Sequence, residues 1–185
     1  MFDKYNYFLI VDLESTCCDD GSIPKGKGEI IEIGAVMMDS KTMEVVDEFN
    51  AFIQPEKYPV LTDFCTELTT ITQDNVNGAS KYPVVSQELS NWLKGFDNYV
   101  FCSWGNYDKN HLALESLKYQ VVNPIQAPHI NVKKVFATEQ RIKPVGMKSA
   151  LTLCQIELVG THHRGIDDAR NIGKLMPYVL GNLSI

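Results

Sequence analysis

The chain has 185 residues, of which 44% are hydrophobic and 22% are charged, an ordinary composition for a globular domain with a buried core. Its net charge of −6 argues against a protein that binds nucleic acid by broad neutralisation of phosphates, although it leaves room for a local site whose positive charge comes from metal ions. No apolar run approaches the roughly 20 residues of a membrane-spanning helix, so we expect no membrane association.

The first part of the chain predicts a meander of three strands. Residues 7–14 are apolar and β-branched, as in a buried strand. After a loop rich in Gly, Lys and Asp, residues 29–39 predict a second strand, and residues 43–54 alternate well enough in polarity to predict a third. Because the strands follow one another through short links, we expect them to pair in an antiparallel sheet.

The rest of the chain mixes helices with strands. From Pro55 onward, prolines and capping residues predict loops and short helices, and residues 98–104 predict another buried strand. Longer helices are predicted at residues 86–94, 109–119, 147–155 and 166–180. This order predicts an α/β fold with a central mixed sheet flanked by helices, and residues 1–185 are expected to form a single domain.

The five cysteines show no regular metal-binding spacing. Cys17 and Cys18 are adjacent, and the other three lie in apolar contexts, so we expect reduced and mostly buried thiols. The first residues have neither a basic stretch nor a long apolar run, so we expect no signal peptide. Together these features favour a cytoplasmic protein.

Two acids in the first strand raise the question of what neutralises them. In the stretch YFLIVDLEST, Asp12 and Glu14 are two residues apart, and side chains at this spacing share one face of a strand. Two like charges there repel, unless a divalent cation such as Mg²⁺ or Mn²⁺ bridges them. The alternative is that both acids lie beyond the buried part of the strand and are solvated.

A third acid, Asp108, follows the buried strand at residues 98–104 and stands where the next helix begins. The alternative to a functional role is an N-cap, which is a common use of aspartate. The two roles are compatible, because sites in α/β proteins form where strands end.

The last helix presents two adjacent acids, and helix geometry separates them. Asp168 shares a face with apolar residues at i+4, i+7 and i+11, which are Ile172, Leu175 and Val179. It therefore points toward the core and needs compensation, either from a metal ion or from an arginine. Asp167 shares its face with Asn171, Lys174 and Tyr178, which are expected to point outward, and we expect it to cap the helix.

Histidines precede both acids at the same distance, His162 before Asp167 and His163 before Asp168. Since Asp168 is the inward acid, we expect His163 to be the functional histidine and His162 to be a surface loop residue. Four acids and one histidine in this order are far more specific than any one of them alone.

With these residues in place, the sequence resembles the DEDDh 3′–5′ exonucleases, which have an RNase H-like fold. The segments VDLEST, WGNYD and HRGIDDARN resemble the three motifs of that family, and the resemblance runs through roughly residues 5–180. A sister branch places tyrosine four residues before the last acid, where this chain has Arg164. The segments EIIEIGAV and FCTELTTITQ favour the ERI/KapD-like members, although those often have Asp at the position of Asn131 and some carry a separate basic domain.

The resemblance implies a reaction in which two divalent cations, Mg²⁺ or Mn²⁺, hydrolyse phosphodiester bonds. It assigns metal binding to four carboxylates, namely Asp12, Glu14, Asp108 and Asp168. Glu14 is also counted as catalytic. It makes His163 the general base, which suits an imidazole near neutral pH.

The resemblance also implies how substrate binds. Phe64 and Tyr107 are candidates for stacking on bases, and backbone groups around Leu13 and Ser15 are candidates for contact with the terminal ribose. Ordinary packing of its loop is the alternative for Phe64. Basic side chains that could contact phosphates, each with a solvated surface charge as the simpler account, are Lys148, Arg164 and Arg170.

These observations predict an exonuclease that acts on single-stranded 3′ ends, RNA more than DNA, and releases nucleoside 5′-monophosphates. One alternative is a proofreading or oligonucleotide-degrading nuclease of the same family. Another is a regulatory interaction protein that keeps the fold without the activity.

Overall fold

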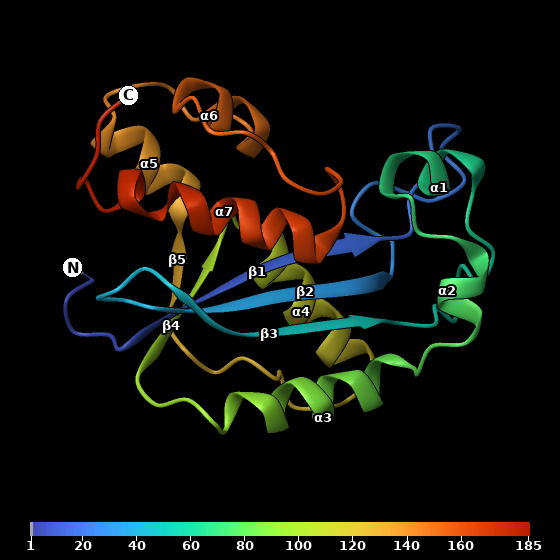
Figure 1. The fold of residues 1–185 in the computed structure, drawn as a ribbon. Coiled ribbons are helices and arrows are strands. Elements are labelled where there is room, and N and C mark those ends of the chain that lie inside the picture. The colour runs from blue at the N-terminus through green and yellow to red at the C-terminus, as the bar shows by residue number, and fades with distance from the viewer. Residues whose placement is uncertain (1) are drawn as a thin grey trace.

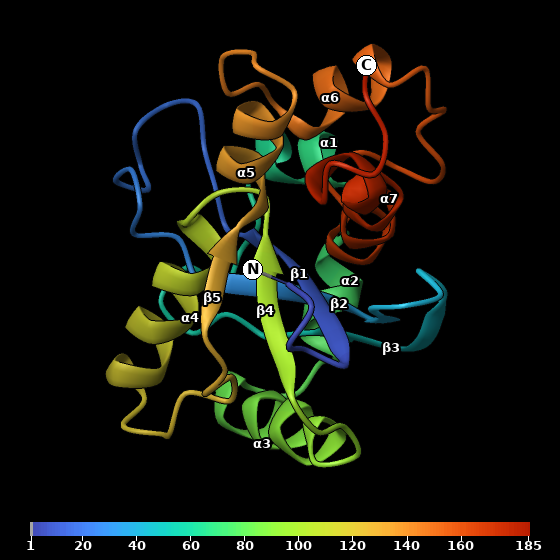
Figure 2. The ribbon, with the colours of Figure 1, turned by 90° about the vertical axis from the view of Figure 1, so that its left-hand side faces the viewer.

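A computed structural model describes residues 2–185 as a five-stranded sheet with helices on both faces (Figures 1 and 2). The strand order is β3-β2-β1-β4-β5. The antiparallel strands are β1 (Tyr7–Ser15), β2 (Ile30–Asp39) and β3 (Val45–Phe52), and those parallel to β1 are β4 (Tyr99–Ser103) and β5 (His129–Asn131). The predicted α/β fold, with an antiparallel three-stranded meander and parallel strands in one mixed sheet flanked by helices, is confirmed.

The helices divide between the two faces of the sheet. Their bounds are α1 (Asp63–Thr69), α2 (Gln73–Asn77), α3 (Tyr82–Leu93), α4 (Tyr107–Lys118), α5 (Val132–Glu139), α6 (Met147–Leu153) and α7 (Gly165–Val179). One apolar cluster joins the sheet to α5, α6 and α7, and a second joins the opposite face to α3 and α4. In Figure 1, α1 and α2 lie beyond the right-hand end of the sheet, near the carboxyl end of β1.

The alternation along β1 decides which face carries the two acids of this strand. Phe8 and Ile10 belong to the cluster under α7, whereas Leu9 and Val11 belong to the cluster over α3 and α4. The even-numbered side chains of β1 therefore face α7. Asp12 and Glu14 continue this even-numbered row toward the carboxyl end of the strand.

Two expected boundaries and one expected gap differ from the structure. The helix expected at residues 86–94 begins earlier, at Tyr82. Its first turn contains Pro83, and proline is well tolerated in the first turn of a helix. The helix expected at residues 109–119 begins at Tyr107. The sequence analysis predicted no element between residues 120 and 146, yet β5 and α5 lie there. The strand was not predicted because three residues are too few to show alternation.

The cysteine prediction is correct in its essentials. Within the described residues all five cysteines are free thiols, three of them buried, while Cys17 and Cys18 are partly exposed. No helix in this part of the chain combines the length and the apolar character that a membrane crossing requires.

A contact between two glycines sets the position of α7 on the sheet. Gly34 of β2 pairs with Asp12 of β1, and a Cβ atom at Gly34 would lie 2.1 Å from the backbone carbon of Gly165, the first residue of α7. A Cβ at Gly165 would lie 2.9 Å from the carbonyl oxygen of Asp12. The start of α7 therefore rests directly on the β1 and β2 backbone, which brings the first turn of this helix to the acids of β1.

We expect the substitution Gly34→Ala to destabilise the protein by about 3 kcal/mol or more, because the new methyl group meets backbone atoms that have no flexible side chain to move aside. Gly78→Ala is the matched control, since its Cβ would meet only the Asp74 carbonyl oxygen at 3.7 Å. Urea unfolding of both variants measures the difference. Equal stability of the two variants would contradict the glycine contact.

Candidate active site

Three carboxylates from two distant segments meet on the α7 face of the sheet. Asp12 and Glu14 come from β1, and Asp168 comes from the first turn of α7. One oxygen from each of the three lies within 4.8 Å of the other two, a separation that suits a shared metal ion. Glu14 and Asp168 are buried, with exposed fractions of 8% and 4%, and Asp12 is partly buried.

The fourth expected acid approaches from the other side of β1. Asp108 is the second residue of α4 and is buried. It is not the N-cap, a position that Asn106 occupies, and its Oδ1 instead accepts a hydrogen bond of 3.2 Å from the backbone amide of Leu13. Its charge contributes to the raised pKa of Asp12. The structure therefore brings all four acids to the carboxyl end of β1, with Asp108 outside the closest group of three.

These acids repel one another in a buried setting. Burial raises the pKa of Asp12 well above its usual range, and the charges of Asp108, Glu14 and Asp168 raise it further. Burial, followed by the charges of Asp168 and Glu32, raises the pKa of Glu14 to about 8. Burial likewise raises the pKa of Asp108 to about 6.

The group of acids has no lysine or arginine partner in the described part of the chain. Within residues 2–185, no lysine or arginine forms an ion pair with any of the four predicted metal ligands. Buried carboxylates of this kind are stable in their charged form only beside cations. The donor set, all hard oxygen atoms, fits divalent ions such as Mg²⁺ or Mn²⁺.

Both histidines lie at Asp168. The backbone amide of His163 donates to Asp168 Oδ2 at 3.1 Å, and the two histidine rings stack with centroids 3.9 Å apart. The prediction that His162 is only a surface loop residue is wrong, because its Nδ1 lies 2.9 Å from Asp168 Oδ2. His163 has a left-handed backbone, with φ of 66°, an uncommon conformation that turns its amide toward the carboxylate.

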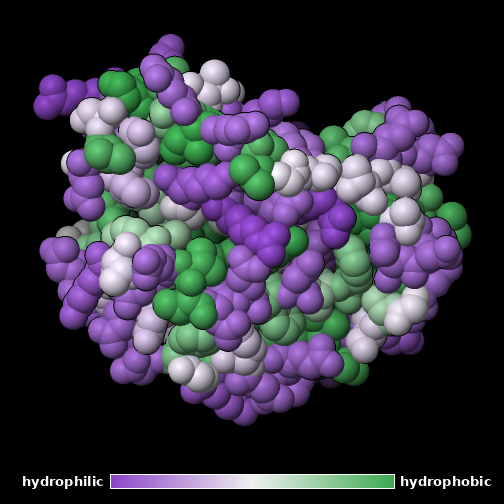
Figure 3. Space-filling model, viewed as in Figure 1, coloured by the Kyte–Doolittle hydropathy of each residue, from purple (hydrophilic) through white to green (hydrophobic). Residues whose placement is uncertain are grey.

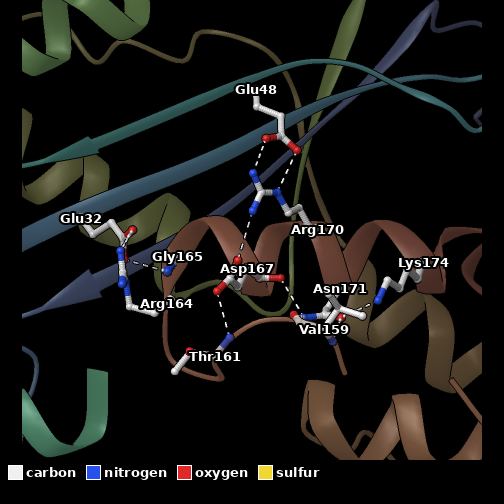
Figure 4. A network of polar contacts seen from close by, with 10 residues as sticks. All are labelled: Glu32, Glu48, Val159, Thr161, Arg164, Gly165, Asp167, Arg170, Asn171 and Lys174. Carbon is white, nitrogen blue, oxygen red and sulfur yellow. Dashed lines mark hydrogen bonds and ion pairs between the residues drawn. The ribbon is translucent and has the colours of Figure 1, made fainter. Parts of the chain in front are cut away.

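A network of polar contacts fixes the loop that carries the histidines (Figure 4). Asp167 Oδ2 accepts from the amide of Thr161 at 2.9 Å, and Asn171 bonds both the amide and the carbonyl of Val159. Two expectations are thereby corrected. Asp167 binds the loop rather than capping the helix, whose N-cap is Arg164, and Asn171 is fully buried instead of pointing outward.

A buried ion pair anchors the end of the same loop. Arg164 Nε and Nη2 donate to the two oxygens of Glu32 at 3.1 and 3.2 Å, and the amide of Gly165 donates to Glu32 at 2.9 Å (Figure 4). Arg164 is therefore not free to bind phosphate, and it does not pair with Asp168. No role for Glu32 was expected from the sequence, although an acid inside the apolar strand EIIEIGAV was a sign that a partner exists.

The second candidate arginine for phosphate contact is also occupied. Arg170 pairs with Glu48 of β3 and with Asp167, and both contacts lie at the surface of the protein (Figure 4). Of the three basic candidates, only Lys148 has no ion-pair partner among residues 2–185, and it lines the cleft beside the acids.

A cleft of about 440 Å³ opens over the acids and the two histidines. Its lining also includes Trp104, Tyr107 and Lys148, and an adjoining hollow of about 550 Å³ runs along residues 13–28. Tyr107 lines both spaces. In Figure 3 the outline of the protein dips here, between the side built by α5 and α6 and the side built by α1.

The structure gives the four predicted substrate-binding residues unequal positions. Tyr107 is 49% exposed and its hydroxyl donates to Ser15 Oγ at 3.1 Å, so both face the cleft region. Phe64 is 36% exposed on α1 and lines neither space. The amide of Leu13 is engaged by Asp108, so this group is unavailable to a ribose.

Comparisons with known proteins identify relatives of this architecture. The sequence profile of a family described as Exonuclease, RNase_T, matches residues 9–176. The chain is 31% identical over 183 residues to 3′-5′ exoribonuclease 1 of Homo sapiens, covering 92% of this chain and 51% of that protein. It is 30% identical over 193 residues to ERI1 exoribonuclease 2 of Mus musculus, covering 92% of this chain and 28% of that protein.

Solved structures agree with this result. The nuclease domain of 3′hExo, a DEDDh family member bound to rAMP, superimposes with a TM-score of 0.88 at 29% identity, covering 96% of this chain and 93% of the other. A structure described as recognition of a histone mRNA stem-loop by 3′-exonuclease gives a TM-score of 0.86 at 27% identity, covering 96% and 64%. The chain thus spans about half or less of the curated relatives described above.

The raised pKa of Glu14 predicts how pH and metal act on stability. A carboxyl whose pKa rises from 4.5 to about 8 on folding stabilises the metal-free protein below pH 4.5, and this stabilisation is lost as pH rises through about 8. Divalent cations bind the ionised form. One pKa unit corresponds to about 1.4 kcal/mol, and 1 kcal/mol shifts Tm by about 2–4 °C in a chain of this size.

We therefore expect Mn²⁺ to raise Tm by at least about 5 °C more at pH 8 than at pH 5. The variant Glu14→Gln should be more stable than wild type without metal at pH 8 and should gain less from Mn²⁺. Thermal unfolding with and without EDTA measures both effects. A metal response that does not depend on pH would contradict this electrostatic account.

The buried ion pair predicts a large effect of one arginine on stability. Arg164→Met leaves Glu32 buried without its partner, so we expect a loss of about 3–5 kcal/mol. Arg170→Met is the matched control, because its ion pairs are exposed and worth about 1 kcal/mol or less. Denaturant unfolding compares the two variants, and similar losses would show that the buried pair does not anchor the loop.

Proposed function

Because this chain belongs to the DEDDh branch of the 3′–5′ exonuclease family, we propose that it hydrolyses phosphodiester bonds at single-stranded 3′ ends and releases nucleoside 5′-monophosphates. The observation that carries the proposal is the convergence of Asp12, Glu14 and Asp168 beside two histidines in an open cleft. RNA is the preferred substrate in this proposal, since the relatives are named as exoribonucleases and the 3′hExo domain is described as bound to rAMP.

Two divalent cations, Mg²⁺ or Mn²⁺, complete the proposed site. Asp12, Glu14 and Asp168 would hold one, and Asp12 with Asp108 would hold the other. When bound, such ions acidify water and stabilise the oxygens on both sides of the scissile phosphorus. Within residues 2–185 the four acids have no lysine or arginine partner, which supports this assignment, because bound cations would supply the compensation that the raised pKa values of Asp12, Glu14 and Asp108 demand.

The proposed general base is His163. Burial and the neighbouring His162 lower its pKa, while Asp168 acts in the opposite direction, so its ring is neutral near pH 7 and able to accept the proton of an attacking water. His162 has a different role in this proposal. Its Nδ1 contacts Asp168 and its ring stacks on His163, so it orients both the acid and the base.

The proposed substrate contacts lie around the junction of the two hollows. Tyr107 is placed to stack on a base, because its exposed ring lines both spaces and its hydroxyl is held by Ser15. Ribose recognition would then involve groups of residue 15 rather than the occupied amide of Leu13. Phe64 contributes only if the substrate extends to α1.

The main experiment is digestion of matched RNA and DNA oligonucleotides with free 3′ ends in Mg²⁺ or Mn²⁺. We expect metal-dependent release of 5′-mononucleotides, faster from RNA. Asp12→Asn should lower kcat by at least about 100-fold, since removal of one electrostatic group at a reacting centre has this order of effect. Degradation of DNA alone, or of dinucleotides alone, would favour the proofreading or oligonucleotide-degrading alternative.

The histidines are separated by a second pair of variants. His163→Ala should lower kcat by about 10²- to 10⁴-fold, as expected for loss of a general base. His162→Ala should lower it much less, and the pH profile of kcat should keep the ionisation assigned to His163. If the larger loss belongs to His162, the roles are exchanged. If wild type cleaves no 3′ end under any of these conditions, the interaction protein becomes the better description.

A further inference from the structure

The positive charge of this acidic chain is concentrated in one segment. Residues 130–150, which contain α5 and the start of α6, carry five basic side chains and one acidic side chain, a net charge of +4 in a chain whose net charge is −6. Residues 61–80, which contain α1 and α2, carry three acids and no lysine or arginine. The two sides of the cleft therefore differ in charge, because α6 borders one side and α1 lies on the other (Figure 3).

Four lysines, three of them in this segment, occupy unusual positions. Lys109 lies in the first turn of α4, Lys133 and Lys134 lie in the first turn of α5, and Lys148 lies in the first turn of α6. The backbone dipole disfavours cations at the start of a helix. By contrast, the first turns of α1, α2 and α7 carry acids and no lysine or arginine, while that of α4 carries both Asp108 and Lys109.

No ion pair in the described part of the protein offsets this cost. Within residues 2–185, none of the four lysines forms an ion pair, and all are exposed or partly exposed. Residues that break a local rule without compensation in the fold are expected at functional sites. These four residues are called the lysine rim below.

Hydrogen bonds hold the three helix starts together at the carboxyl edge of the sheet. Asn131, the N-cap of α5, donates through Nδ2 to Asn106 Oδ1, the N-cap residue of α4, at 3.2 Å. Trp104, just after β4, donates through Nε1 to the carbonyl of Val145 at 3.0 Å, directly before α6. Since β1, β4 and β5 are parallel, their carboxyl ends lie on the edge that also carries the acids.

The rim begins inside the candidate active site and leads away from it. Lys148 lines the cleft with His163 and Asp168, and its charge contributes to the lowered pKa of His163. The other rim lysines lie at the starts of α4 and α5, which follow β4 and β5 in the sheet order. In Figure 2, β4 and β5 run side by side and β5 leads directly into α5.

We propose that the lysine rim binds the phosphates of the nucleic-acid strand on the 5′ side of the scissile nucleotide. The 3′-terminal nucleoside then occupies the hollow along residues 13–28, and the strand leaves the cleft over α6, α5 and α4, away from the acidic α1 and α2. This inference rests on the proposed nuclease function and adds the direction of the substrate strand. Lysine binds phosphate through its charge, and phosphate is common to RNA and DNA. The rim therefore contributes affinity and does not discriminate between RNA and DNA.

The test compares two variants with equal changes of charge. The rim variant is Lys133→Gln/Lys134→Gln/Lys148→Gln. The control variant carries Lys4→Gln/Lys41→Gln/Lys94→Gln, three exposed lysines at the opposite edge of the sheet, where β1 begins. Fluorescence anisotropy measures binding of a dodecanucleotide and a trinucleotide, as RNA and as DNA, in Ca²⁺ between about 50 and 200 mM salt.

We expect the rim variant to bind the dodecanucleotide about 10- to 100-fold more weakly, and the slope of log K against log salt to fall by about 0.7 for each phosphate that the lysines no longer neutralise. The trinucleotide should be weakened less, RNA and DNA should be weakened alike, and the control variant should match wild type. Because the removed cations oppose the helix dipoles, the rim variant should have a Tm equal to or higher than that of wild type.

Equal salt slopes for the rim and control variants would overturn the proposal, as would an equal weakening for the trinucleotide and the dodecanucleotide. These results are independent of turnover. A wild type that cleaves RNA while the rim variant binds normally would refute the rim and leave the proposed function intact. A wild type that binds through the rim and cleaves nothing would support the rim and refute the proposed function.

Discussion

The repulsion among buried carboxylates at the end of β1 is the interaction on which the rest of this structure depends. Four acids from β1, α4 and α7 are enclosed together without a lysine or arginine partner within the described residues. The raised pKa values of Asp12, Glu14 and Asp108 express a free-energy cost that the folded chain bears without metal. Folding against such a cost is expected where binding of a cation recovers it.

The elements around the acids serve to hold them in this unfavourable arrangement. The glycine contact between β2 and α7 brings the first turn of α7 onto the sheet, and the Glu32–Arg164 pair fixes the residue before that turn. Asn171 and Asp167 bind the preceding loop and so place the two histidines at Asp168. These contacts use charge pairs and backbone groups that are not available to a substrate, which explains why Arg164 and Arg170 are structural.

Charge in this protein is local, and its net value is a poor guide to function. A net charge of −6 argues against binding by broad neutralisation of phosphates, yet the carboxyl edge of the sheet combines an acidic pocket with a rim of lysines. A nuclease that holds one strand end needs both, because cations neutralise the scissile phosphate while side chains hold the remainder of the strand. On the other side of the cleft, α1 and α2 are acidic, which favours a strand that leaves the cleft over the lysine rim.

Short-range periodicity in the sequence determined the strands of the meander, the shared face of Asp12 and Glu14, and the inward direction of Asp168, because each depends on residues only a few positions apart. Only the tertiary structure decided the partners. In the folded protein Arg164 forms an ion pair with Glu32, the Leu13 amide donates a hydrogen bond to Asp108, and the His162 ring contacts Asp168. It also revealed β5 and α5, whose short strand has no periodicity of its own and forms by pairing with β4. Contacts between residues far apart in the chain depend on how the elements pack, and no local pattern encodes them.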